Sequence, residues 1–276
     1  MLKSSPVYGQ EGAFCMNDET LTAVIFTRID DILQGLSIDS HPGPQGRLSL
    51  SEVLCLMVLQ PVLKPTWTLK GYSFWLEHNF KHLFPGLVDY SRLRRLFNNA
   101  QEYAAVIVQK LSNGNSFGLI ADGTPIGVME AVRGPYAKSF RNARKVLSAS
   151  KKQWYWGFLL ELVIDQQGQI AFWSVGTEAE IRQLANILED LANRWLLGDR
   201  GNRSKDLHER LWQDKQICIK ITGGKERQWI ENVIGVLKGR LGLEKIRKIR
   251  TMPSFLSRVK AILCAYNLSQ DLLLPI

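Results

Sequence analysis

Residues 154–176, WYWGFLLELVIDQQGQIAFWSVG, indicate the class of fold. Two runs rich in aromatic and branched residues, 154–165 and 170–176, flank the turn Asp165-Gln-Gln-Gly168. Such runs joined by a short Gly-containing turn predict two antiparallel strands. A third run of the same type, FGLIAD at 117–122, comes before them. We therefore expect three consecutive strands that form a meander.

Helical and strand-like segments alternate after this meander. The expected helices cover 178–194, 204–215 and 225–242, and the expected strands cover 195–199 (WLLGD) and 216–221 (QICIKI). Three meandering strands followed by strand-helix units describe an α/β fold. The sequence predicts a mixed five-stranded sheet with flanking helices.

The first part of the chain has a different pattern. Helical spacing and end signals predict helices over 19–35, from Ser49 through VLCLMVLQ, over 67–83 and over 90–112. Ser49 and Glu52 have the spacing of a capping box. The turn-rich LSNGNS at 111–116 then separates an all-helical region, 1–112, from the α/β domain, 113–276.

Composition and charge restrict the class of protein. Of 276 residues, 45% are hydrophobic and 22% charged, which is typical of a globular chain with a sizeable core. The net charge is +9, and basic and acidic residues balance up to residue 115, so the whole excess lies in the second half. A basic domain favours a polyanionic partner, such as nucleic acid or an anionic membrane surface. A soluble protein of high pI is the plainer interpretation.

Several classes are disfavoured. The four cysteines are far apart and form no C-x-x-C pair, which argues against a zinc ribbon or a disulfide scaffold. No apolar run reaches the ~18 residues of a membrane span, and MLKSSPVYGQEGAF has no apolar signal core. We therefore expect a cytoplasmic protein without a membrane partner.

Two strand-like runs end on an acid, Asp122 in FGLIAD and Asp199 in WLLGD. Neighbouring parallel strands in one sheet would bring these carboxylates within a few ångströms of each other. Two carboxylates that close repel each other unless a cation lies between them. Oxygen ligands suit Mg²⁺ or Mn²⁺, so the pair predicts a divalent metal site.

The helix expected at 225–242 offers a third acid. At 100° per residue, Arg227, Glu231 and Lys238 lie on one edge of this helix, beside an apolar stripe. If the stripe packs on the sheet, the Arg-Glu-Lys row runs along the strand ends. Each acid also has an ordinary explanation: Asp199 as a helix cap, Asp122 as a turn residue, and Glu231 as an ion-pair partner of Arg227 or Lys238.

These segments resemble a known family. IADGTP, LLGDRG and the spacing R-x3-E-x6-K of Arg227, Glu231 and Lys238 are similar to the DDE transposases of bacterial insertion sequences. The nearest resemblance is to the branch with a Tyr-Arg-Glu-Lys signature, and it covers about residues 117–268. SLSEVLCLMVL and DYSRLRRLF are similar, less specifically, to the N-terminal regions of these elements.

The resemblance implies a ribonuclease-H-like fold and DNA transposition. Asp122, Asp199 and Glu231 would be catalytic and would bind two Mg²⁺ or Mn²⁺ ions, one for the attacking oxygen and one for the leaving oxygen. Water would first free a 3′-hydroxyl at the element's end, and that hydroxyl would then attack target DNA. By analogy a homodimer would act on paired terminal inverted repeats. A nuclease without joining activity and an inactive, repurposed DNA-binding protein are the alternatives.

The chain departs from the family pattern at three places. Gly224 stands where the signature Tyr is expected, the loop between QICIKI and Glu231 is short, and Leu159 replaces a Lys that relatives often carry. These departures concern the handling of the DNA end more than the metal site.

Basic residues flank the proposed site in two clusters, KSFRNARK with Lys151 and Lys152, and KGRLGLEKIRKIR. Phosphate contacts from such clusters supply affinity that does not depend on sequence. The residues expected to contact DNA are Arg144, Lys145, Lys151, Lys152, Arg227, Lys238, Arg240 and Arg247. Arg92, Arg94 and Arg95, behind Asp89, suit either a helix-turn-helix reader of DNA ends or a plain surface helix.

Overall fold

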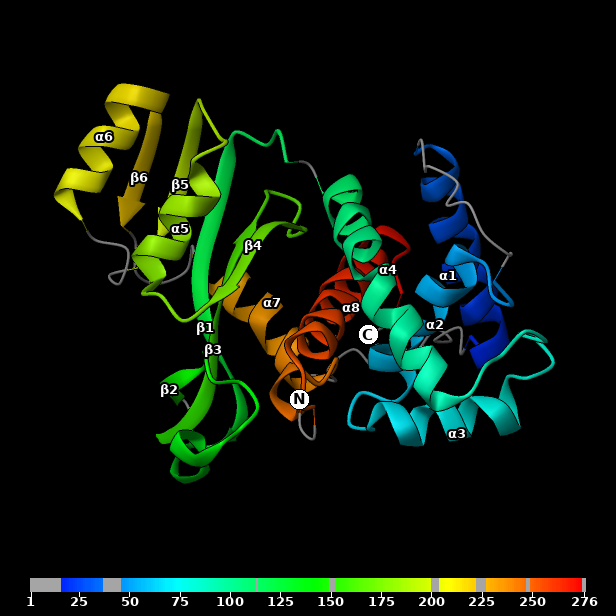
Figure 1. Cartoon of the computed structure of the whole chain (residues 1–276). Coiled ribbons are helices and arrows are strands. Elements are labelled where there is room, and N and C mark those ends of the chain that lie inside the picture. The colour runs from blue at the N-terminus through cyan, green and yellow to red at the C-terminus, as the bar shows by residue number, and fades with distance from the viewer. Residues whose placement is uncertain are drawn as a thin grey trace, which may run out of the picture.

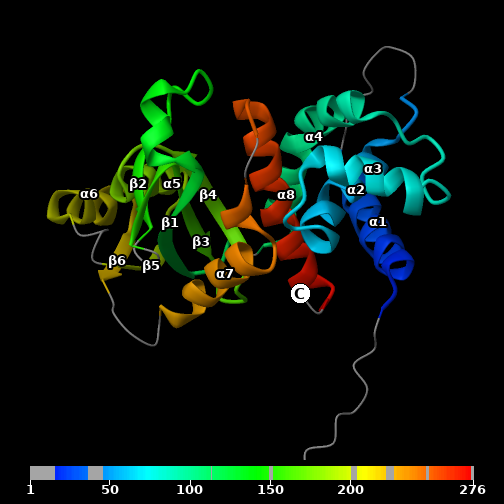
Figure 2. The same cartoon turned by 90° about the horizontal axis from the view of Figure 1, so that it is seen from below.

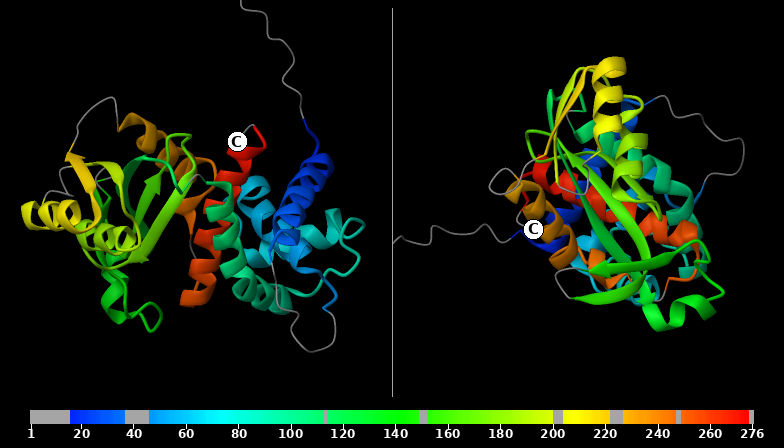
Figure 3. Two further views of the ribbon diagram at one scale, coloured as in Figure 1. Left: turned by 90° about the horizontal axis from the view of Figure 1, so that it is seen from above. Right: turned by 90° about the vertical axis from the view of Figure 1, so that its left-hand side faces the viewer.

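The computed structural model describes residues 16–36, 46–112, 114–148, 152–199, 204–221, 227–246 and 249–274. A twisted sheet with helices on its faces forms one side of the molecule, and a group of helices forms the other (Figure 1). The last helix, α8 (Met252–Asp271), lies between these two parts (Figure 3). No helix in the described ranges is long and apolar enough to cross a membrane.

The N-terminal region is helical, as predicted. Its helices are α1 (Asp18–Gln34), α2 (Leu50–Leu63), α3 (Leu69–Asn79) and α4 (Tyr90–Leu111). Each begins behind a residue whose side chain accepts a hydrogen bond from a backbone N–H of the first turn: Asn17, Ser49, Thr68 and Asp89. The capping box between Ser49 and Glu52 is formed. Local end signals therefore determine where these helices start.

The sheet has six strands. They are β1 (Gly118–Glu130), β2 (Arg144–Ser148), β3 (Gln153–Ile164), β4 (Ile170–Gly176), β5 (Arg194–Gly198) and β6 (Ile217–Ile221). Their order is β2-β3-β1-β5-β6, and β4 also pairs with β3. β3 pairs antiparallel with β1, β2 and β4, whereas β1-β5 and β5-β6 are parallel. This mixed sheet after a helical region confirms the ribonuclease-H-like α/β fold.

The structure corrects the sequence-based expectation at two strands. β2 makes the sheet six-stranded rather than five-stranded; its sequence RKVLS looks like part of a basic cluster, but it pairs with one half of β3. β1 does not end at Asp122, because its pairing with β3 continues to Glu130. Pro125 is tolerated within β1 because β5 pairs with β1 only through Ile120.

Helices cover both faces of the sheet. α5 (Glu180–Leu188) and α6 (Lys205–Lys215) lie on one face, and α7 (Gln228–Gly239) lies on the other (Figure 2). α5 is shorter than the predicted 178–194. Side chains of β1 alternate accordingly: Leu119 and Ala121 pack with Leu184 of α5, whereas Ile120 belongs to the core on the α7 side.

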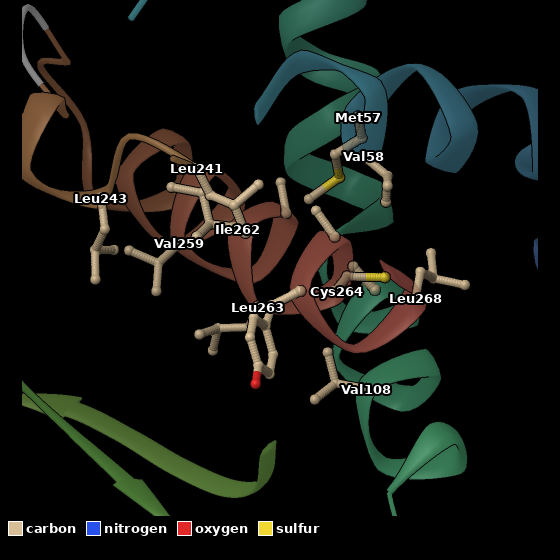
Figure 4. Close-up of a cluster of buried hydrophobic side chains, with 14 of the residues drawn as sticks. Met57, Val58, Val108, Leu241, Leu243, Val259, Ile262, Leu263, Cys264 and Leu268 are labelled. Carbon is tan, nitrogen blue, oxygen red and sulfur yellow. The ribbon is translucent and has the colours of Figure 1, made fainter. Parts of the chain in front are cut away.

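Helix α8 joins the helical region to the sheet. Its apolar residues Val259, Ile262 and Leu263 pack in one cluster with Met57 of α2 and Val108 of α4 (Figure 4). Leu241 and Leu243, around the short 3₁₀ helix η3 (Leu243–Lys245), join the same cluster. The core is therefore continuous across residue 112, and the proposed domain boundary there stays a prediction.

Asn267 of α8 connects the two parts through its amide. It is fully buried, accepts a hydrogen bond from Ile170 N, and donates to Val108 O and Ile170 O. We expect Asn267→Leu to lower the free energy of unfolding by about 2–4 kcal/mol, because it removes all three hydrogen bonds by which the buried amide joins α4 to β4. Urea unfolding would measure this loss; the neighbouring substitution Ser269→Ala, which removes a single local bond, should cost less. Equal losses would contradict the role of Asn267.

Candidate active site

Asp122 and Asp199 occupy corresponding positions on two parallel strands. β1 and β5 pair with Ile120 opposite Leu197. Continued by two residues, this register brings Asp122 opposite Asp199, which directly follows β5. The charge of Asp199 acts on Asp122. The predicted proximity is therefore present, although Asp122 lies within its strand.

The start of α7 brings the third acid to the same place. The Arg227 guanidinium, at the N-cap, donates a hydrogen bond of 3.1 Å from Nη2 to Asp122 Oδ2. The same Nη2 atom lies 3.9 Å from Asp199 Oδ2 and 3.7 Å from Glu231 Oε1. All three acids therefore have an oxygen within 3.9 Å of one nitrogen atom. The helix is held there by its buried apolar stripe, Ile230, Val233, Ile234 and Leu237.

Arg227 supplies the positive charge of this cluster. Burial raises the pKa of Asp122, and Asp199 adds to that rise, while Arg227 opposes both. Burial by itself lowers the pKa of Arg227, but Asp122, Asp199 and Glu231 outweigh it and raise that pKa. In this conformation the Arg227 guanidinium is a positive partner that all three carboxylates share.

Two further carboxylates lie close to Asp122 on the other face of β1. Glu161 is opposite Gly123 in the β1-β3 pairing, and Glu180 begins α5. A Cβ atom on Gly123 would lie 2.7 Å from Glu180 Oε1 and 2.9 Å from Glu161 Oε2. The absence of a side chain at Gly123 therefore leaves the room that both carboxylates occupy.

Glu161 has no hydrogen-bond partner for its carboxyl group among the described residues. It is completely buried, and both of its carboxylate oxygens lack a hydrogen-bond partner. Burial, followed by the charges of Glu180, Asp122 and Asp199, raises its pKa to about 9. The pKa of Glu180 is also raised, mainly by burial and then by Asp199 and Asp122. Burying a carboxylate is unfavourable, so the surroundings of Glu161 and Glu180 shift both groups toward their protonated forms.

The comparisons with known proteins identify the family. A family model described as the transposase DDE domain matches residues 113–257, which is more than half of the chain. This chain belongs to the DDE transposases. It is therefore a DNA transposase, an enzyme of phosphoryl transfer. The more specific assignment to bacterial insertion sequences stays a prediction.

Solved structures offer only distant likenesses to this transposase. The pre-cleavage Mos1 transpososome has a TM-score of 0.30 and 10% identity, with 86% of this chain and 83% of that chain covered. The Mos1 strand transfer complex has a TM-score of 0.24 and 9% identity, covering 85% and 81%. No curated protein sequence matches the chain. The assignment of the family therefore rests on the family model.

The acids of the transposase suit a divalent cation in their chemistry. They offer carboxylate oxygens, the ligands that Mg²⁺ and Mn²⁺ prefer, and the buried oxygens of Glu161 beside them have no hydrogen-bond partner among the described residues. Among the described residues, no three Asp, Glu, His or Cys side chains are already arranged so that they could hold a metal ion. Arg227 lies between the three predicted acids instead, so cation binding requires its guanidinium to shift.

The residues expected to contact DNA are spread around the transposase. Lys238, at the far end of α7, lies 4.0 Å from Glu244 Oε1. Arg144 donates to the backbone oxygen of Glu178, beside the start of α5. Lys145 is exposed, with its Nζ 4.9 Å from the ring centre of Trp154.

The remaining expectations divide into two groups. Lys152, near the start of β3, and Arg240, at the C-cap of α7, are exposed. Lys151, Arg247, Gly224 and the short loop of 222–226 lie outside the described residues. The structure therefore describes Lys152 and Arg240 of this set, whereas the roles of Lys151 and Arg247 stay predictions.

Sequence reasoning missed Glu161 and Glu180. Glu161 interrupts the apolar run FLLELVI at a position that the pairing with β1 buries. An acid inside such a run is the signal that could have singled it out, because Glu is almost never fully buried without a partner. Glu180 has no comparable signal, since an acid in the first turn of a helix is ordinary.

Proposed function

We propose that Asp122, Asp199 and Glu231 are the catalytic acids of this transposase and hold two divalent metal ions. The observation that supports this is their convergence on the Nη2 atom of Arg227 from two strands and one helix that are far apart in the chain. When bound, the ions would activate the attacking oxygen and stabilise the leaving oxygen of the phosphodiester.

The chain's own residues prepare the site for a polyanion. Without Arg227, a cluster of carboxylates would repel a DNA phosphate. Because the guanidinium can present two parallel N–H groups to an anion, we propose that Arg227 turns from Asp122 toward the phosphate when a metal ion replaces it beside the acids. Its partly buried position limits competition from water. Arg227 would then position the scissile phosphate next to Asp122.

We propose that DNA reaches the acids along basic side chains. Arg144 and Lys145 belong to β2, Lys151 and Lys152 follow them in the sequence, and Arg240 and Arg247 come after α7 in the sequence. Lys238 would contact the phosphate backbone of the DNA further along α7. These contacts would make binding weaken steeply as salt is raised.

The reaction proposed for this site has two stages, cleavage at the element's ends and joining to target DNA. The experiment uses the DNA that flanks the gene on a supercoiled plasmid, with Mg²⁺ or Mn²⁺ and with EDTA as control. We expect cuts at inverted repeats with metal only. A labelled, pre-cut end should then become joined to a second plasmid.

The outcome separates this proposal from the alternatives. Cutting without joining would identify a nuclease, and DNA binding without cutting would identify a repurposed DNA-binding protein. Light scattering of the protein with and without paired ends tests the proposed homodimer, for which we expect two copies per pair of ends.

A further inference from the structure

A cavity of about 500 Å³ lies between the helical region and the start of α8. It is lined by residues of α2, of the segment 65–68, of the start of α3, of the first half of α4, and of 245–246 and 249–261. Its size is within the range of small-molecule binding sites. None of the three proposed catalytic acids lines it.

The lining of this cavity is strongly basic. Five cationic side chains contribute to it, Lys70, Arg94, Lys245, Arg250 and Arg258, and no Asp or Glu is among the lining residues. Arg258 is buried and the other four are exposed, and like charges gathered around one cavity repel each other, which is unfavourable for the protein alone. An anionic occupant would remove this cost.

Arg258 is the lining residue that most directly indicates an anionic ligand. It is 9% exposed, and its Nη2 donates to the backbone oxygen of Pro65 at 2.9 Å. Its Nη1 is buried and has no hydrogen-bond partner. Burial lowers the pKa of Arg258 to about 10, and the neighbouring charge that opposes this is the Tyr72 phenol. The guanidinium therefore stays charged near neutral pH without a carboxylate to balance it.

The N-terminus of α8 adds to the positive potential. Thr251 is the N-cap of this 20-residue helix, and no side chain caps its first turn. Thr251 and Ser254 both line the cavity. Unsatisfied N–H groups at a helix start attract anions. They act here beside the buried guanidinium of Arg258, whose Nη1 has no hydrogen-bond partner among the described residues.

Aromatic side chains form another part of the lining. Trp67 is 44% exposed, Tyr90 of α4 is half-buried, and the buried Phe97 also belongs to the lining. Exposed aromatic rings beside cations are the combination that stacks a base and holds its phosphate. An inorganic anion would leave these rings unused.

We propose that this cavity binds one nucleotide unit of a DNA strand, with its phosphate at Arg258 and the start of α8 and its base against Trp67 or Tyr90. This inference rests on the proposed function only in requiring DNA as a partner. It assigns a DNA-anchoring role to the junction of α4 and α8, apart from the acids that perform the chemistry.

The first test compares two adjacent arginines of α4. Arg94 lines the cavity, whereas Arg95 is equally exposed but does not line it. Fluorescence anisotropy with a labelled 30-base-pair duplex should show that Arg94→Ala weakens binding about tenfold and makes its salt dependence shallower by about one phosphate contact. Arg95→Ala should change binding by less than about twofold. Equal effects of the two variants would overturn the proposal.

The second test separates a ligand from a structural role for Arg258. Arg258→Met removes an uncompensated buried charge, so its melting temperature should equal or exceed that of the wild type while DNA affinity falls at least about tenfold. A lower melting temperature with unchanged DNA affinity would assign Arg258 to the fold alone.

The third test locates the base. A duplex carrying 5-iododeoxyuridine, irradiated in the complex, should crosslink to Trp67 or Tyr90. Crosslinks elsewhere only would overturn the proposal. A second result would also overturn it. In that result inorganic phosphate or thymidine monophosphate stabilises the wild type but not Arg258→Met, and yet the two proteins bind the duplex equally well. Cleavage of element ends by the wild type, measured in parallel, reports separately on the proposed function.

Discussion

Asp122→Asn is expected to reduce cleavage at the element's ends by at least about 10³-fold, because it removes a charge that the transition state requires at the metal site. Asp122 is the acid in closest contact with Arg227 and the most deeply buried of the three proposed catalytic acids. Its replacement therefore affects both the metal ions and the placement of Arg227. Single-turnover cleavage with Mn²⁺ measures the effect.

The fold should tolerate this substitution. Since burial raises the pKa of Asp122, holding its charge there costs free energy, and Asn should keep the melting temperature within a few degrees of the wild type. Calorimetric titration with Mn²⁺ should show weakened binding. Asp190→Asn, an exposed acid just beyond α5, is the matched control and should leave both readouts unchanged. Cleavage by Asp122→Asn above about one tenth of the wild-type rate would exclude the proposed site.

Glu161→Gln is expected to stabilise the metal-free protein at alkaline pH. Because the folded pKa is about 9 and the ordinary value is 4.5, the folded state holds a proton that the unfolded state releases between these values. Stability of the wild type is therefore complete below about pH 4.5 and declines as pH rises toward 9. The amide cannot ionise, so the variant lacks this decline.

The measurement is the melting temperature from pH 5 to 9 in EDTA. At pH 8 we expect Glu161→Gln to melt roughly 5 °C or more above the wild type, and at pH 5 the two should nearly coincide. Added Mn²⁺ should stabilise the wild type more than the variant, because the variant has one negative charge fewer near the ions. Glu189→Gln, exposed at the end of α5, serves as control. Parallel pH curves for Glu161→Gln and the wild type would show that Glu161 is not the buried, ionisable group described.

Much of the fold follows from local patterns. The strands β3, β4, β5 and β6 and the starts of the N-terminal helices lie where apolar runs and cap residues predict them, because these signals act within a few residues. The capping box of Ser49 and the turn at Asp165–Gly168 are examples. The juxtaposition of Asp122 with Asp199 could also be foreseen, since parallel strands of one sheet end at the same edge.

Tertiary structure decided the rest. The segment RKVLS forms β2 only because it pairs with β3. Strand β1 continues beyond Asp122 only because β3 is long enough to pair with its second half. Arg227, rather than a ready-made ligand set, meets all three acids, and Glu161 joins them through pairing opposite Gly123. Arg258 becomes an unbalanced charge only where α8 closes against α2 and α4. Hydrophobic periodicity and capping act between neighbours in sequence, whereas the desolvation and charge balance of a side chain depend on segments that only folding brings together.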